Sequence, residues 1–139
     1  MLTGIDPMLS GELLLHLDAM GHSDAVVIAD AHFPAARLSS RLVVLPTLST
    51  PEVLRAVRTV IPLDDEPVLD LMTSADGTVL DVQHELIAAA GTRLDAVRFV
   101  DRFAYYDEAA TAFLLVIRTG ETRKYGNVTL RKGLVTPGA

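Results

Sequence analysis

Two histidines and two aspartates flank a short apolar run near the amino end of this 139-residue chain. His22 and Asp24 precede the run Ala25–Ala29, and Asp30 and His32 follow it. Imidazole exchanges protons near neutral pH, and imidazole and carboxylate groups both bind metal ions. A buried strand has no structural need for such groups at both of its ends. We therefore expect acid–base or metal chemistry at this strand.

These polar residues also have purely structural interpretations. His22 follows a predicted helix, whose carboxyl end favours a protonated imidazole that either donates a proton or only satisfies helix carbonyls. Asp30 stands at the carboxyl end of a predicted parallel strand, where ligands of open α/β sheets bind, but it could instead cap the turn into Pro34. Asp24 is typical of a turn. The spacing of His22, Asp30 and His32 also allows a divalent metal site, although no further cluster of ligands completes it.

Two other segments bring polar and aromatic side chains together. Arg102, Tyr105 and Tyr106 lie at a predicted strand-to-helix corner, and both residue types suit sugar binding. For at least one of the tyrosines we expect packing in the core instead. Tyr125 and Asn127 lie in a Lys-Tyr-Gly-Asn segment that is typical of an ordinary β-turn and would place a phenol beside an amide.

The apolar pattern predicts an α/β fold in which strands and helices alternate. The expected helices are 12–20, 50–60, 81–90 and 103–110, and the expected strands are 25–29, 41–45, 68–72, 97–100, 112–118 and 128–130. Ser10, Thr50 and Asp81 are the expected helix caps. Short links favour a mainly parallel sheet with helices on both faces, in a single domain that spans 1–139.

Composition narrows the class of protein. Half of the residues are apolar, and the longest apolar runs have the length of a strand rather than of a membrane span. No signal-peptide pattern and no cysteine is present, so we expect a cytoplasmic protein without disulfides or thiolate ligands. The net charge is −6, and basic residues are concentrated in 118–139, so the acidic charge lies in 1–117. An acidic surface there argues against a general nucleic-acid binder, which needs a basic face to bind phosphates.

Taken together, these segments resemble the sugar mutarotase family of fucose mutarotase and ribose pyranase. The resemblance extends over nearly the whole chain, apart from about 62–94, and rests on Met20-Gly-His22, Asp30-Ala-His-Phe-Pro34, Arg102-Phe-Ala-Tyr-Tyr106 and Lys124-Tyr-Gly-Asn127. The segments at 30–34 and 102–104 are similar to the fucose branch. In the ribose branch, a small residue usually stands in place of His32 and a histidine in place of Arg102.

The resemblance implies an isomerase that interconverts the anomers or ring forms of a free monosaccharide, L-fucose or a related sugar, without cofactor or metal. It implies that His22 is the catalytic acid–base group. The sugar-binding residues that it implies are Asp30, Arg102, Tyr125 and Asn127. We also expect His32, which marks the fucose branch, to line the pocket and contact the sugar. It also implies a ring-shaped homo-oligomer, typically a decamer, with sites between neighbouring subunits. In such an assembly, Arg102 and the 125–127 turn could meet the strand from a neighbouring subunit.

Mutarotation suits these residue types. One proton leaves the anomeric hydroxyl and another reaches the ring oxygen, so the ring opens to an aldehyde that rotates and recloses. Three alternatives stay open at this point. They are a ribose pyranase-type activity on D-ribose, a metal-dependent enzyme that uses His22, Asp30 and His32, and a sugar-binding module without catalysis.

Overall fold

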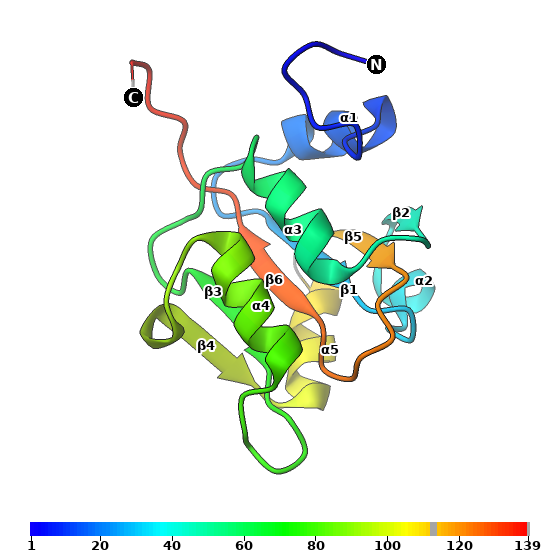
Figure 1. Ribbon diagram of the computed structural model, residues 1–139, viewed down its shortest axis with the longest axis vertical. Helices are drawn as coiled ribbons and strands as arrows, with labels where there is room; N and C mark the ends of the chain where they lie inside the picture. Colours follow the sequence, from blue (N-terminus) through cyan, green and yellow to red (C-terminus); the bar gives the residue numbers. More distant parts are fainter. Residues whose placement is uncertain (112–113, 139) are drawn as a thin grey trace.

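The computed structural model describes residues 1–111 and 114–138, which fold around a six-stranded sheet (Figure 1). The strands are β1 (Ala25–Ala29), β2 (Arg41–Leu45), β3 (Leu69–Met72), β4 (Val97–Val100), β5 (Leu114–Thr119) and β6 (Val128–Arg131). They lie in the order β2-β5-β1-β6-β3-β4. β1, β2 and β5 form one parallel group and β3 and β4 a second, and β6 joins the groups by running antiparallel to β1 and β3. The prediction of a mainly parallel sheet is confirmed.

Helices cover both faces of this sheet, as the sequence predicts. α1 (Gly11–Ala19), α3 (Thr50–Arg58) and α4 (Asp81–Ala90) pack on one face, in a core that includes Val26 and Ile28 of β1. α2 (Ala35–Leu38) and α5 (Arg102–Thr111) pack on the other face, in a core that includes Ala25, Val27 and Ala29. Alternate residues of β1 therefore enter opposite cores, which is the pattern of a strand buried on both sides. In Figure 1, α3 and α4 lie in front of the sheet.

Several predicted boundaries match the structure residue for residue. The strands predicted at 25–29, 41–45 and 97–100 are β1, β2 and β4. The strand predicted at 112–118 corresponds to β5, and positions 112–113 of that prediction lie outside the described residues. The apolar pattern does not predict α2 or the 3-10 turn η1 (Leu94–Ala96), because segments this short show no apolar period.

The predicted cap of α3 is wrong by one residue. Ser49, rather than Thr50, caps the helix, since its Oγ accepts a hydrogen bond from the backbone N–H of Glu52 at 3.3 Å. The Glu52 carboxylate in turn accepts from the Ser49 N–H at 2.8 Å. This capping box leaves Pro51 in the first turn, where a backbone N–H has no partner within the helix.

The caps of α1 and α4 show one correct prediction and one error. Ser10 caps α1 as predicted, with its Oγ accepting from the backbone N–H of Leu13 at 3.2 Å. Asp81 is instead the first residue of α4, and Leu80 is its cap. The N–H of Leu80 donates to Oε1 of Gln83 at 3.1 Å, so a buried glutamine supplies the side-chain half of the cap.

The strand order decides which segments meet at the carboxyl edge of the sheet. β1 and β3 end at this edge, β4 leads there into α5, and β6 starts there because it runs the opposite way. Ligands of open α/β sheets bind at such an edge. In residues 1–111 and 114–138, no helix has the length and apolar character needed to span a membrane.

Candidate functional site

A hollow of about 340 Å³ opens at the carboxyl edge of the sheet. Segments from the ends of β1 and β3, the start of α5 and the turn before β6 form its wall, and the lining residues are Asp30, His32, Met72, Arg102, Tyr106, Lys124, Tyr125 and Asn127. This volume lies within the usual range for small-molecule sites. One chain thus brings together all five residues that were expected to bind a sugar, and no second chain is needed for Arg102 or the 125–127 turn to reach Asp30.

Asp30 and Asn127 form a reciprocal pair in this hollow. Both are buried, with 6% and 3% of their surfaces exposed. The backbone N–H of Asp30 donates to Oδ1 of Asn127 at 2.7 Å, and Nδ2 of Asn127 donates to Oδ2 of Asp30 at 3.1 Å. The other carboxylate oxygen accepts from the N–H of His32 at 2.9 Å. Burial raises the pKa of Asp30 above its ordinary value, and the hydrogen bonds from His32 and Asn127 only partly oppose this.

The predicted turn is present at 124–125, and its backbone is unusual at Tyr125. Tyr125 has a φ of 60°, in the left-handed region that residues other than glycine rarely adopt. At Gly126, a Cβ would lie 3.0 Å from Cγ of Glu121 and 3.1 Å from the carbonyl oxygen of Arg123, so glycine is the residue that fits. Backbone strain of this kind persists only where the surroundings hold it, and it is common at functional sites.

Arg102 lies at the exposed rim of the hollow, at the first residue of α5. Its Nε donates to the Tyr106 hydroxyl at 3.3 Å, and this hydrogen bond raises the pKa of Arg102. The guanidinium also lies 5.2 Å from the ring centre of Phe103 and 5.7 Å from that of Tyr106. Tyr105 is buried and accepts a hydrogen bond from Thr129 at 2.7 Å, so the expected core packing of at least one tyrosine is confirmed.

A buried carboxylate holds the segment that leads to the Tyr125 turn. Glu121 is 5% exposed and accepts hydrogen bonds from Nε and Nη2 of Arg123 at 3.1 and 2.9 Å. Burial alone would raise the pKa of Glu121, but the hydrogen bonds from Arg123 outweigh it and the pKa lies below its ordinary value. Arg123 also pairs with Glu85 of α4, and the Glu121 carbonyl accepts from the Ala31 N–H at 2.9 Å. The segment is therefore anchored to α4 and to the end of β1.

His22 lies at the opposite edge of the sheet from the hollow. It precedes β1, whose five residues alone span about 17 Å, and its side chain is 52% exposed. A hydrogen bond of 3.1 Å joins its Nε2 to Oδ1 of Asp64, and Ser23 Oγ donates to Oδ2 of Asp64 at 2.7 Å. The hydrogen bonds from Ser23 and His22 lower the pKa of Asp64. Within one chain, His22 does not reach a sugar bound beside Asp30.

The same separation removes the geometric basis of the alternative metal site. His22 lies at one edge of the sheet, whereas Asp30 and His32 line the hollow at the other. Across the part of the chain that the structure describes, no three His, Asp or Glu side chains are grouped so that they could hold a metal ion. Within one chain, this fold therefore does not bring His22, Asp30 and His32 close enough together to bind one metal ion.

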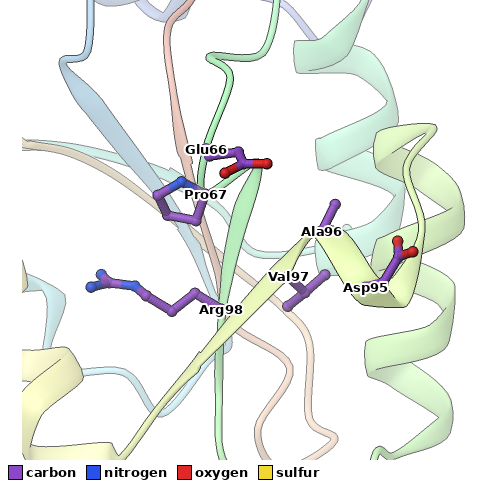
Figure 2. Close-up of a pocket in the computed structure, with 6 residues that line it drawn as sticks. All are labelled: Glu66, Pro67, Asp95, Ala96, Val97 and Arg98. Atoms are coloured by element: carbon purple, nitrogen blue, oxygen red, sulfur yellow. The ribbon is translucent and has the colours of Figure 1, made fainter.

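A second hollow, of about 380 Å³, lies beside β4 at the edge of the sheet (Figure 2). Its lining residues are Glu66, Pro67, Asp95, Ala96, Val97 and Arg98. Figure 2 shows the carboxylates of Glu66 and Asp95 apart from each other, with the Arg98 guanidinium extending away from Asp95. That guanidinium binds Asp70 at 3.0 and 2.8 Å and Glu108 at 2.6 Å. Because these polar groups do not converge, we assign the candidate site to the first hollow.

Sequence reasoning did not single out Met72, although it lines the first hollow. Met72 ends the buried strand β3 and is an apolar residue of the kind that fills a core. The place of Met72 at the end of β3 could have indicated its role, since the last residue of a parallel strand lies where ligands bind.

Comparison with known proteins identifies the family of this chain. Residues 3–135 match the model of the RbsD/FucU transport protein family. The chain belongs to this family. The match covers every residue that lines the first hollow, and it confirms the family resemblance found in the sequence motifs.

Solved structures with the RbsD/FucU fold are similar to the chain over almost its full length. Protein Atu2016 is 34% identical with a TM-score of 0.88, over 98% of this chain and 97% of that one. The fucose mutarotase of Streptococcus pneumoniae, solved in complex with L-fucose, is 30% identical with a TM-score of 0.87, over 97% and 100%. FucU from Bifidobacterium longum is 34% identical with a TM-score of 0.83, over 96% and 100%.

Proposed function

We propose that this protein is a sugar mutarotase that interconverts the ring forms of a free monosaccharide, L-fucose or a close relative, by acid–base ring opening. The observation that carries the proposal is the buried Asp30–Asn127 pair in a hollow whose wall also holds Arg102 and Tyr125. Membership of the RbsD/FucU family supports it, as does the similarity to a fucose mutarotase that binds L-fucose.

The roles of the lining residues follow from their chemistry. The Asp30 carboxylate accepts hydrogen bonds from sugar hydroxyls, while the planar fork of Arg102 donates to them. Asn127 fixes the carboxylate, and Tyr125 offers both a ring face and a hydroxyl. His32 is exposed at the hollow and completes its wall. In this proposal these groups hold the sugar, and the proton transfers are assigned to a further group.

We infer that this group is His22 of a neighbouring copy. His22 is exposed and is held by Asp64 at the edge opposite the hollow. A contact between opposite edges of two copies is head-to-tail, and head-to-tail contacts that close produce rings. This geometry supports the ring-shaped homo-oligomer, typically a decamer, that the resemblance implies. At the sugar, the imidazole would take the anomeric proton and return one to the ring oxygen.

Saturation-transfer NMR on a panel of free sugars, L-fucose and D-ribose first, tests the activity. We expect the protein to accelerate exchange between the L-fucose anomers in the presence of a metal chelator. Loss of acceleration on chelation would favour a metal-dependent enzyme, and greater acceleration with D-ribose would favour a pyranase. Saturable binding without acceleration would identify a binding module.

Mixing two inactive variants tests the site between subunits. We expect His22→Ala and Asp30→Ala each to abolish acceleration. In mixed rings refolded from equal amounts, each site draws His22 from one copy and Asp30 from another, so roughly a quarter of the sites are intact. If the mixed rings stay inactive, His22 does not belong to a site shared between subunits. The same conclusion follows if the His22→Ala variant alone accelerates exchange at the wild-type rate.

A further inference from the structure

Gln83 is a fully buried side chain, 0% exposed, that lies behind the hollow without lining it. Its Nε2 donates to the carbonyl oxygens of Met72 at 2.7 Å and of Tyr125 at 3.4 Å. Its Oε1 accepts from the Leu80 N–H at 3.1 Å. Met72 and Tyr125 both line the hollow. One amide thus joins two segments of the wall to the first turn of α4.

The surroundings of Gln83 permit one orientation of its amide. The oxygen faces an N–H donor at Leu80, and the nitrogen faces two carbonyl acceptors. Rotation by half a turn would set the oxygen against both carbonyls in a buried place, where mismatched polar groups are costly. The amide therefore fixes the separation between the end of β3 and the Tyr125 turn.

Tyr125 is the residue that needs such an anchor. Its φ of 60° is strained for a residue with a side chain, and its backbone carbonyl is one of the two groups that Gln83 holds. A turn released from this hydrogen bond would relax toward commoner backbone angles. The Tyr125 side chain would then leave its place in the wall of the hollow.

We propose that Gln83 is a positioning residue for the sugar site, which holds Tyr125 in its left-handed conformation and so directs its side chain into the hollow. Gln83 acts through Tyr125 and Met72 and does not touch the sugar. This inference rests on the proposed function, because the binding it supports is that of a monosaccharide in the same hollow.

Gln83→Glu is the discriminating variant. A glutamate keeps the size and the acceptor for the Leu80 N–H, as Glu52 does for Ser49 in α3, but it places an oxygen against the two carbonyls. Glu52→Gln is the matched control, since it makes the reverse exchange in an exposed capping box that does not line the hollow.

We expect Gln83→Glu to raise KM for anomer exchange at about pH 8 by tenfold or more, because a misdirected contact weakens sugar binding. The activity relative to wild type should recover as the pH falls. A buried carboxyl has a raised pKa, and its protonated form regains a donor toward the carbonyls. Glu52→Gln should match wild type at every pH. A purely structural defect would show no such recovery.

Each outcome decides the proposal. A wild-type KM for Gln83→Glu at about pH 8 would overturn it, as would a loss that does not recover at lower pH. If Gln83→Glu does not fold, Gln83→Met has a similar size and no donor, and its KM should be raised at all pH values. A wild-type KM for Gln83→Met, or failure of both variants to fold, would also overturn the assignment.

The failure of the proposed function would give a different pattern. In that case the wild-type protein would accelerate exchange of none of the sugars. Equilibrium binding of L-fucose across the same pH range would then decide the role of Gln83. Weaker binding by Gln83→Glu that recovers at low pH would support positioning, and unchanged binding would reject it.

Discussion

Asp30 and Asn127 exchange two hydrogen bonds at the junction of β1 and β6, at 2.7 and 3.1 Å, although 97 positions separate them in the chain. Each residue orients the other before any ligand arrives. The entropy lost in ordering these side chains is therefore lost on folding and not on binding, which favours affinity. This relationship also determines how the site should respond to pH.

Sugar binding should weaken as the pH falls through the pKa of Asp30. The carboxylate accepts hydrogen bonds from hydroxyls, and protonation removes part of that capacity. Because burial raises this pKa, the loss should begin at a higher pH than for an exposed aspartate with the ordinary value of 3.8. The raised pKa also affects stability. At a pH above this pKa, burial of the ionised Asp30 lowers the free energy of unfolding, and this penalty disappears as the pH falls and the carboxylate is protonated. Calorimetric titration with L-fucose between about pH 3 and 8 measures the midpoint. A midpoint at or below 3.8 would contradict this prediction.

Asp64→Ala should slow anomer exchange by about tenfold while leaving KM nearly unchanged. Asp64 binds His22 and Ser23 at the edge opposite the hollow, so its loss frees the imidazole without touching the sugar contacts. Asp65→Ala is the matched control, since only the backbone N–H of Asp65 contacts Asp64. Saturation-transfer rates at several sugar concentrations separate kcat from KM. An unchanged kcat for Asp64→Ala would argue that Asp64 does not orient His22.

Asp70→Ala should lower the free energy of unfolding by about 1.5–3 kcal/mol at pH 7, the scale of a lost hydrogen bond to a charged group. The Asp70 side chain is 3% exposed and binds Arg98 and Arg131. Without Asp70, Arg98 keeps its pair with Glu108, whereas Arg131 loses its ion pair. Burial opposes ionisation, but the hydrogen bonds from the two arginines outweigh it and lower the pKa of Asp70. Urea denaturation measures the effect.

The lowered pKa also sets how the Asp70 contribution depends on pH. It is present above the ordinary pKa of 3.8 and is lost as the pH falls through the folded value. The stability difference between wild type and Asp70→Ala should therefore shrink in strong acid. Asp95→Ala removes an exposed pair with Arg93 and should leave stability unchanged. A difference that persists undiminished in acid would show that packing, and not the ion pairs, accounts for the loss.

Tyr125→Gly should abolish sugar binding while keeping the free energy of unfolding within about 1 kcal/mol of wild type. Glycine relieves the strain of a φ of 60° but removes the side chain that lines the hollow. The comparison needs urea denaturation and a fucose titration on the same preparation. A variant that binds L-fucose normally would remove Tyr125 from the site, and one that is severely destabilised would show that its packing outweighs the strain.

The residues of the candidate site could be predicted more fully than their arrangement. Asp30 was recognisable because a carboxylate at the carboxyl end of a buried apolar strand faces the ligand edge of a parallel sheet. The separation of His22 and Asp30 was predictable as well, since the two residues stand at opposite ends of the expected strand 25–29, but which edge carries the hollow required the assembled sheet. Gln83, by contrast, was hidden. A polar residue in the first turn of a helix has the composition of an exposed face, and only the tertiary fold shows that it is buried.

The place of β6 was beyond local reasoning too. Its four residues have the composition of an ordinary strand, and neither propensity nor pattern says which strands it pairs with. The register with β1 and β3 is decided by packing across both faces. Because Asn127 directly precedes β6, this register also decides that Asn127 meets Asp30.

The position of β6 has a consequence for how the chain reaches its native state. Within the described strands, the group of β1, β2 and β5 and the group of β3 and β4 are connected through β6, which is the last strand of the six to leave the ribosome. β6 covers the inner edges of β1 and β3, and unpaired strand edges are prone to wrong pairing. Pairing of β6 closes loops of high contact order, a slow class of step. Because Asn127 directly precedes β6, we expect the pocket that Asp30 and Asn127 share to be complete only once β6 has paired with both groups.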